Sequence, residues 1–112
     1  EVNMVKLPSY EGDMSILKNH ISIITFLRPG VIKVEKNNTN LEEFFVQDGT
    51  VEFFNNNLVV LSTSALSIKN ISKEFLDNLN QDTLKKLENH DISDQDRYIL
   101  NQKLDILKEI RI

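Results

Sequence analysis

The spacing of apolar residues changes near Ala65, and this change constrains the fold more than any other feature of the chain. Before it, short apolar runs alternate with clusters of Gly, Pro, Asn, Asp and Ser, as in β-strands joined by turns. After it, Leu and Ile recur every three or four residues, as on one face of an α-helix. We therefore expect an all-β sandwich domain over residues 1–66, followed by an antiparallel α-helical hairpin over residues 67–112.

The expected strands follow from the apolar runs and from the turn residues between them. They cover Val2–Leu7, Met14–Leu17, Ile21–Leu27, Val31–Glu35, Glu43–Gln47, Thr50–Phe54 and Leu58–Thr63. We expect Pro8 to end the first strand, because proline offers no N–H to a neighbouring strand. The last strand is apolar on both faces, which predicts a position inside the sandwich.

Four clusters of turn residues join these strands. Pro29-Gly30 has the residues that a type II turn requires at its central positions. Asn37–Asn40 and Asn55–Asn57 predict further turns, since Asn tolerates the left-handed region of the backbone. Asp48-Gly49 between two strand-like runs predicts a β-hairpin.

Two serines mark where the helices begin. Ser72 precedes one apolar periodic run and Ser93 precedes the other, and serine is a preferred N-cap residue. Asp94 and Asp96 would also favour the positive end of the second helix. Because few residues separate the two runs, we expect the helices to lie antiparallel.

Composition excludes several classes of function. The net charge of −4 and the pI of about 5.1 argue against binding to nucleic acid or to anionic lipid, both of which need clustered Lys and Arg. The chain has no Cys, and therefore neither disulfides nor thiolate chemistry. We see no signal peptide, and the apolar runs are too short to span a bilayer. These properties are typical of a soluble domain that binds other proteins.

Catalytic candidates are few. The chain has only two histidines, His20 and His90, and neither has metal-ligand spacing to a second ligand. A small hydrolase could use His20 with Asp13, but no third residue completes such a site. We therefore predict no catalytic residue and no metal site, and we expect a protein that is not an enzyme by itself.

Several segments resemble the epsilon subunit of bacterial F-type ATP synthases, a family that includes the mitochondrial delta subunit. The family pattern G-E-x-G-[IV]-L-x-x-H-A-P, followed by L-K-P-G, is similar to Gly12–His20 and Leu27–Val31. The family segments E-E-F-x-V-x-G-G-x-x-E-V and V-x-V-L-A-D-x-A are similar to Glu43–Glu52 and Val59–Ala65. The departures are Ser15 and Asp48 in place of glycines and Ser22 in place of a proline. The chain begins with Glu1, and against the family pattern about 20 residues, or the first two strands, are absent, so we expect either a fragment or a chain that starts at an unusual point.

The resemblance implies a rotating central-stalk subunit that links the gamma subunit to the ring of c subunits. It implies that the C-terminal helices can reach the alpha/beta catalytic head and restrain ATP hydrolysis. It places the protein peripherally on the cytoplasmic face of the bacterial inner membrane. Asp13 and His20 match family residues near the c ring and gamma, and they are therefore subunit-interface candidates.

Some bacterial members of the family bind ATP through an [IL]-D-x-x-R-A motif. The matching residues here are Ile71-Ser72-Lys73-Glu74-Phe75-Leu76, without the Asp, Arg and Ala of the motif, so we expect no cofactor. The alternative reading is a free-standing β-sandwich protein-interaction module in an unrelated assembly.

Overall fold

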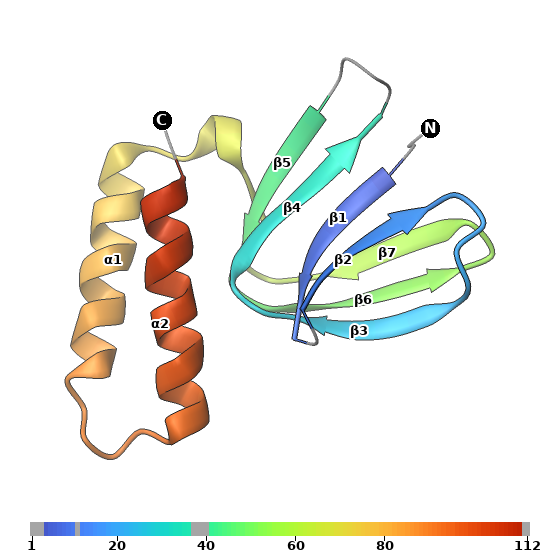
Figure 1. The fold of residues 1–112 in the computed structure, drawn as a ribbon. Helices are drawn as coiled ribbons and strands as arrows, with labels where there is room; N and C mark the ends of the chain where they lie inside the picture. Colours follow the sequence, from blue (N-terminus) through green and yellow to red (C-terminus); the bar gives the residue numbers. More distant parts are fainter. Residues whose placement is uncertain (1–3, 11, 37–40, 111–112) are drawn as a thin grey trace.

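The chain folds into a run of strands followed by two helices, in the order that the apolar spacing predicts (Figure 1). A computed structural model describes residues 4–10, 12–36 and 41–110. The strands are β1 (Met4–Ser9), β2 (Gly12–Leu17), β3 (Ile23–Leu27), β4 (Gly30–Glu35), β5 (Leu41–Val46), β6 (Gly49–Phe54), β7 (Asn57–Leu61) and β8 (Leu66–Ser67). A short 3-10 turn, η1 (Ile68–Asn70), leads to α1 (Lys73–Leu87) and α2 (Asp94–Glu109).

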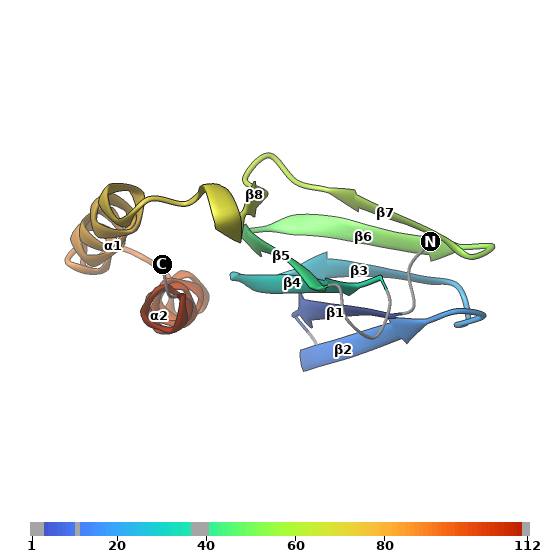
Figure 2. The ribbon, with the colours of Figure 1, turned by 90° about the horizontal axis from the view of Figure 1, so that it is seen from above.

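The strands form one hydrogen-bonded path that folds into two layers. The path runs β7-β6-β3-β1-β4-β5-β8, and β2 pairs with β1 beside it. β1 and β3 share only the pair Ser9 and Leu27, so the sheet turns sharply there. We call β3, β6 and β7 the three-stranded layer and the remaining strands the five-stranded layer (Figure 2).

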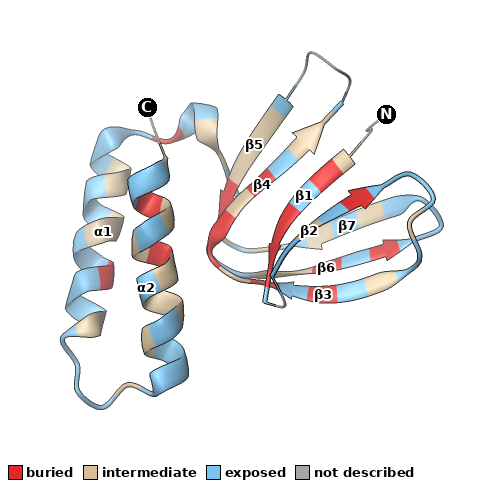
Figure 3. Cartoon of the chain, in the orientation of Figure 1, coloured by how far each residue is buried: buried red, intermediate tan, exposed pale blue. Residues whose placement is uncertain are grey.

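The main hydrophobic core lies between these layers. Both layers contribute to it, with Val5, Leu7, Ile16, Ile32 and Val46 from one and Leu27, Val51 and Phe53 from the other. Figure 3 marks the buried stretches of the strands in red. The β-sandwich followed by a helical hairpin is therefore confirmed.

Both helices begin where the serine caps predict. The Ser72 hydroxyl accepts a hydrogen bond from the Phe75 amide at 3.0 Å. The Ser93 hydroxyl does the same for the Asp96 amide at 3.0 Å. Arg97 of α2 donates to the Leu87 carbonyl at 3.1 Å and so satisfies a carbonyl that has no partner within α1. The helices run antiparallel, side by side (Figure 1).

A second apolar cluster joins the hairpin to the sandwich. Its buried members are Phe45 of β5, Ile71 just before α1, and Leu107 of α2. Phe45 is fully buried. Phe44 and Val46 contact the main core, so Phe45 between them points to the opposite, outer face. The hairpin therefore covers part of the outer face of the five-stranded layer.

Two glycines predicted for turns have another role. The Asp48-Gly49 hairpin prediction is wrong, because β5 and β6 do not pair and lie in different layers. A Cβ on Gly49 would lie 2.8 Å from the Leu61 carbonyl oxygen, so close approach requires glycine there. The type II turn at Pro29-Gly30 is also wrong, because Gly30 does not adopt positive φ. Its missing Cβ would meet Pro8 at 2.5 Å.

Local signals were more reliable at the β6–β7 turn. Asn55 and Asn56 adopt φ of 53° and 61°, which confirms the predicted turn and joins two paired strands. Pro8 does not end β1 as expected, since the strand continues to Ser9 and the Pro8 carbonyl accepts from the Arg28 amide at 2.9 Å. The turn expected at Asn37–Asn40 lies outside the described residues.

Candidate protein-binding surfaces

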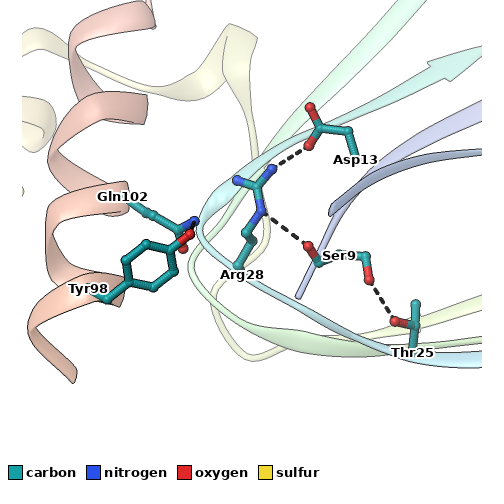
Figure 4. A network of polar contacts seen from close by, with 6 residues as sticks. All are labelled: Ser9, Asp13, Thr25, Arg28, Tyr98 and Gln102. Carbon is teal, nitrogen blue, oxygen red and sulfur yellow. Dashed lines mark hydrogen bonds and ion pairs between the residues drawn. The ribbon is translucent and has the colours of Figure 1, made fainter. Parts of the chain in front are cut away.

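Asp13 belongs to a polar network where the two layers meet (Figure 4). It lies on β2 with its side chain 84% exposed and forms an ion pair with Arg28. The Arg28 Nε donates to the Ser9 carbonyl at 3.1 Å, and the Ser9 and Thr25 hydroxyls form a buried hydrogen bond of 2.8 Å. The network fixes the end of the β1–β2 hairpin against β3, and Asp13 presents its carboxylate at that end.

A groove separates this network from α2. The Gln102 side chain reaches into it from α2 toward Arg28, and its Nε2 donates to the Tyr98 hydroxyl at 3.1 Å (Figure 4). The charged lining is mixed in sign and consists of Lys6, Asp13, Arg28, Lys33, Glu43, Asp105 and Glu109. Cations and carboxylates nearly balance, so the electrostatics of the groove favour neither an anionic nor a cationic ligand.

His20 lies beyond the other end of β2. Its Nδ1 is 2.6 Å from the Ile21 carbonyl oxygen, and its ring meets Phe53 edge to face at a centroid distance of 6.0 Å. The structure therefore does not bring His20 and Asp13 together, and it gives no support to a hydrolase built on that pair. Among residues 4–10, 12–36 and 41–110, no group of His, Asp and Glu could hold a metal ion.

The loop of His20 is held by a pair of asparagines. The Asn19 amide donates to the Asn56 side-chain oxygen at 2.7 Å, and the Asn56 side-chain nitrogen donates back at 3.1 Å. Both residues have positive φ, of 66° and 61°. The β2–β3 and β6–β7 loops are thus joined at this end of the sandwich, next to Ile21, which is 80% exposed.

The outer side of the three-stranded layer is uncovered and mostly apolar, with Thr50 and the exposed Glu52 between its apolar side chains. We call it the apolar face, and its members are Ile24, Phe26, Phe54, Val59 and Leu61. Each of these side chains is between 49% and 69% exposed. Leu58 and Val60 contact the core instead, so the alternating residues of β7 serve both faces. Clustered exposed apolar side chains mark a surface for another protein.

Sequence analysis did not identify this surface. It placed Leu58–Thr63 inside the sandwich, which is wrong because β7 is the outermost strand of its layer and Val59 and Leu61 are exposed. The signal was present in the double-sided apolar pattern of that strand. That pattern predicts burial of both faces, but a sequence does not show whether a face is buried by the chain's own strands or by another molecule.

The outer side of the five-stranded layer is mostly polar. Lys6, Ser15, Lys33 and Glu43 lie opposite one another on β1, β2, β4 and β5. We call this surface the polar face. Glu42 alternates with Glu43 along β5 and so points to the other side of the layer. Lys36 donates to Glu42 at 2.8 Å, and this hydrogen bond and positive charge lower the pKa of Glu42. None of the described helices is long and apolar enough to cross a membrane.

These observations define a class of protein: a small β-sandwich that carries a helical hairpin and leaves one apolar outer face open for a partner. The family model of the ATP synthase delta/epsilon chain β-sandwich domain matches residues 1–68. An ATP synthase epsilon chain of Pelagibacter ubique is 44% identical over 98% of this chain and 84% of its own length. An ATP synthase epsilon chain of Parvibaculum lavamentivorans is 33% identical over 99% of this chain and 83% of its own length. The chain therefore belongs to the delta/epsilon family of ATP synthase chains.

Solved structures share the fold. A chain of the Euglena gracilis mitochondrial ATP synthase, in a structure of its OSCP, F1 and c-ring, matches with a TM-score of 0.69 and 18% identity. That match covers 96% of this chain and 66% of the other. A chain of the Tetrahymena thermophila mitochondrial ATP synthase central stalk and c-ring matches with a TM-score of 0.65 and 13% identity. It covers 96% of this chain and 81% of the other.

Proposed function

We propose that this chain is a non-catalytic central-stalk subunit of a proton-translocating ATP synthase, and that it binds the gamma subunit through the apolar face. Membership of the delta/epsilon family supports a place in an ATP synthase. The apolar face supports binding to another protein of that complex. Five large apolar side chains remain exposed on one side of a layer whose other side builds the core. Covering them with a partner would remove apolar surface from water, which is favourable by about 25 cal/mol for each Å² buried.

His20 and Asp13 would serve different contacts in such an assembly, because they lie at opposite ends of β2. The His20 loop continues into the apolar face through the exposed Ile21, which favours a role beside gamma. Asp13 presents a charged, exposed group at the other end, which suits the c ring. In this role the chain would lie peripherally on the cytoplasmic face of the membrane.

The helical hairpin would act on the alpha/beta catalytic head. It is joined to the sandwich by one small cluster around Phe45, Ile71 and Leu107, and such a contact can be exchanged for one of similar area on another subunit. No nucleotide is required for this role, and we propose that the chain binds no cofactor.

Two matched substitutions test the gamma interface. Leu61→Asp places a carboxylate on the apolar face, and Leu17→Asp makes the same change on the outer side of β2, where leucine is 53% exposed. Binding to purified gamma would be measured by size-exclusion chromatography and calorimetry. We expect Leu61→Asp to weaken binding by at least about thirtyfold, or about 2 kcal/mol, as for a buried interface residue.

Leu17→Asp should change the affinity less than about threefold, within the usual range for residues outside an interface. Equal losses for both variants, or a wild-type chain that does not bind gamma, would contradict the proposal. The second result would favour an interaction module of another assembly.

A further inference from the structure

Lys103 is the one charged side chain buried in the described part of the hairpin. It lies on α2 and is only 6% exposed. One turn away on the same helix is Leu107, which belongs to the cluster that joins the hairpin to the sandwich. The buried position of α1 is Thr83, whose hydroxyl donates to the Leu79 carbonyl at 2.7 Å. Lys103 thus occupies a site where an apolar residue is expected.

The charge of Lys103 has little compensation. Among the described residues, none forms a hydrogen bond or an ion pair with its ammonium group, which keeps some contact with solvent although the rest of the side chain is buried. The charged groups that act on it are Lys86 and Asp82 of α1 and Asp48 at the corner before β6. Asp82 is 3.5 Å from Lys86, so its negative charge is already shared with another lysine.

Both burial and the nearby Lys86 charge lower the pKa of Lys103, and burial is the larger cause. A lowered lysine pKa means that the charged form is less stable in the docked hairpin than in water. Each unit of lowering shifts the equilibrium about tenfold toward an open form in which the ammonium is solvated. This cost acts at neutral pH, where the lysine is charged in the open form.

We propose that Lys103 is a built-in release element, which keeps the docked hairpin close in free energy to an open state. An apolar residue of the same length would remove the cost without leaving a cavity. The inference deepens the regulatory role given to the hairpin above and rests on it for its meaning in the enzyme. The stability of the docked hairpin is, however, a property of this chain alone.

Hydrogen exchange of the full chain provides the test, with Lys103→Met as the variant. Lys108→Met is the matched control, because Lys108 lies on the same helix and is exposed. We expect exchange of the α2 amides to slow by more than about threefold in Lys103→Met and to change less than about threefold in Lys108→Met. The β6 amides should be unchanged in both. Unchanged or faster α2 exchange in Lys103→Met would overturn the proposal.

A second measurement does not depend on how methionine fits. Because the docked pKa lies below the open one, the open form binds more protons between the two values, and docking strengthens as pH rises through that interval. After correction for intrinsic exchange rates, α2 protection in the wild type should therefore increase, relative to Lys103→Gln, as pH rises toward the ordinary lysine pKa of about 10.4. Parallel pH profiles would refute the release element, whereas the gamma-binding experiment would stand unaffected.

Discussion

Each outer face of the sandwich carries a phenylalanine side chain, but one of the two is buried and the other is exposed. On the five-stranded layer Phe45 points outward and is fully buried, because the hairpin covers it. On the three-stranded layer Phe26 points outward and is 62% exposed. The chain thus covers part of one face with its own helices and leaves the other exposed. A phenylalanine at each position predicts that the side chain is buried. Only the three-dimensional fold shows whether another part of the same chain buries it.

The largest test of this comparison removes one aromatic ring from each face. Phe45→Ala should lower the free energy of unfolding by about 3–5 kcal/mol, since it empties a fully buried site. Phe26→Ala should change it by less than about 0.5 kcal/mol, as for other exposed positions. Urea denaturation of the isolated chain measures both. Similar losses in the two variants would mean that Phe26 is covered in the isolated protein.

The corner between the two layers provides the next test. Gly49 joins β5 to β6 at φ 155°, with the Leu61 carbonyl oxygen where a Cβ would lie. Gly49→Ala should cost about 1–3 kcal/mol, because both the backbone and the clash oppose it. Gly12→Ala is the control, since Gly12 has φ 121° but open space around it. If thermal denaturation shows Gly12→Ala to be as costly, the close approach at the corner contributes nothing.

The smallest effect concerns the ion pair between Lys36 and Glu42, where β4 ends and β5 begins. Lys36 holds the pKa of Glu42 below its usual range through a hydrogen bond and its charge. The pair therefore stabilises the fold above the ordinary glutamate pKa, and this contribution is lost as pH falls through the lowered value. Lys36→Ala should raise the Glu42 pKa toward its usual value, as measured by NMR titration. An unchanged pKa would show that the pair does not persist in solution.

Features set by near neighbours in the sequence could be predicted. Ser72 and Ser93 cap their helices because the amide that each binds is only three residues away. The Asn55-Asn56 turn likewise depends on the backbone of those two residues alone. Gly30 and Gly49 were misinterpreted because the atoms that exclude a Cβ belong to Pro8 and Leu61, which are distant in the sequence.

The candidate surfaces follow the same division. The resemblance supplied Asp13 and His20, and the expected strand Met14–Leu17 already lies between them in the sequence. Only the fold shows that Asp13 pairs with Arg28 and that His20 packs against Phe53. The apolar face could not be predicted, because it depends on which side of β7 faces the core. Lys103 was missed for a similar reason, since a lysine within a helix ordinarily lies in solvent.

The hydrogen bonds between Asn19 and Asn56 have a consequence for the speed and cost of association. They connect two loops at the end of the apolar face before any partner arrives. A loop that is already ordered loses little conformational entropy on docking, so more of the contact free energy is retained as affinity. The encounter also needs no slow rearrangement at this end. In the proposed contact with gamma, the Asn19–Asn56 pair would thus lower the entropic cost of recognition.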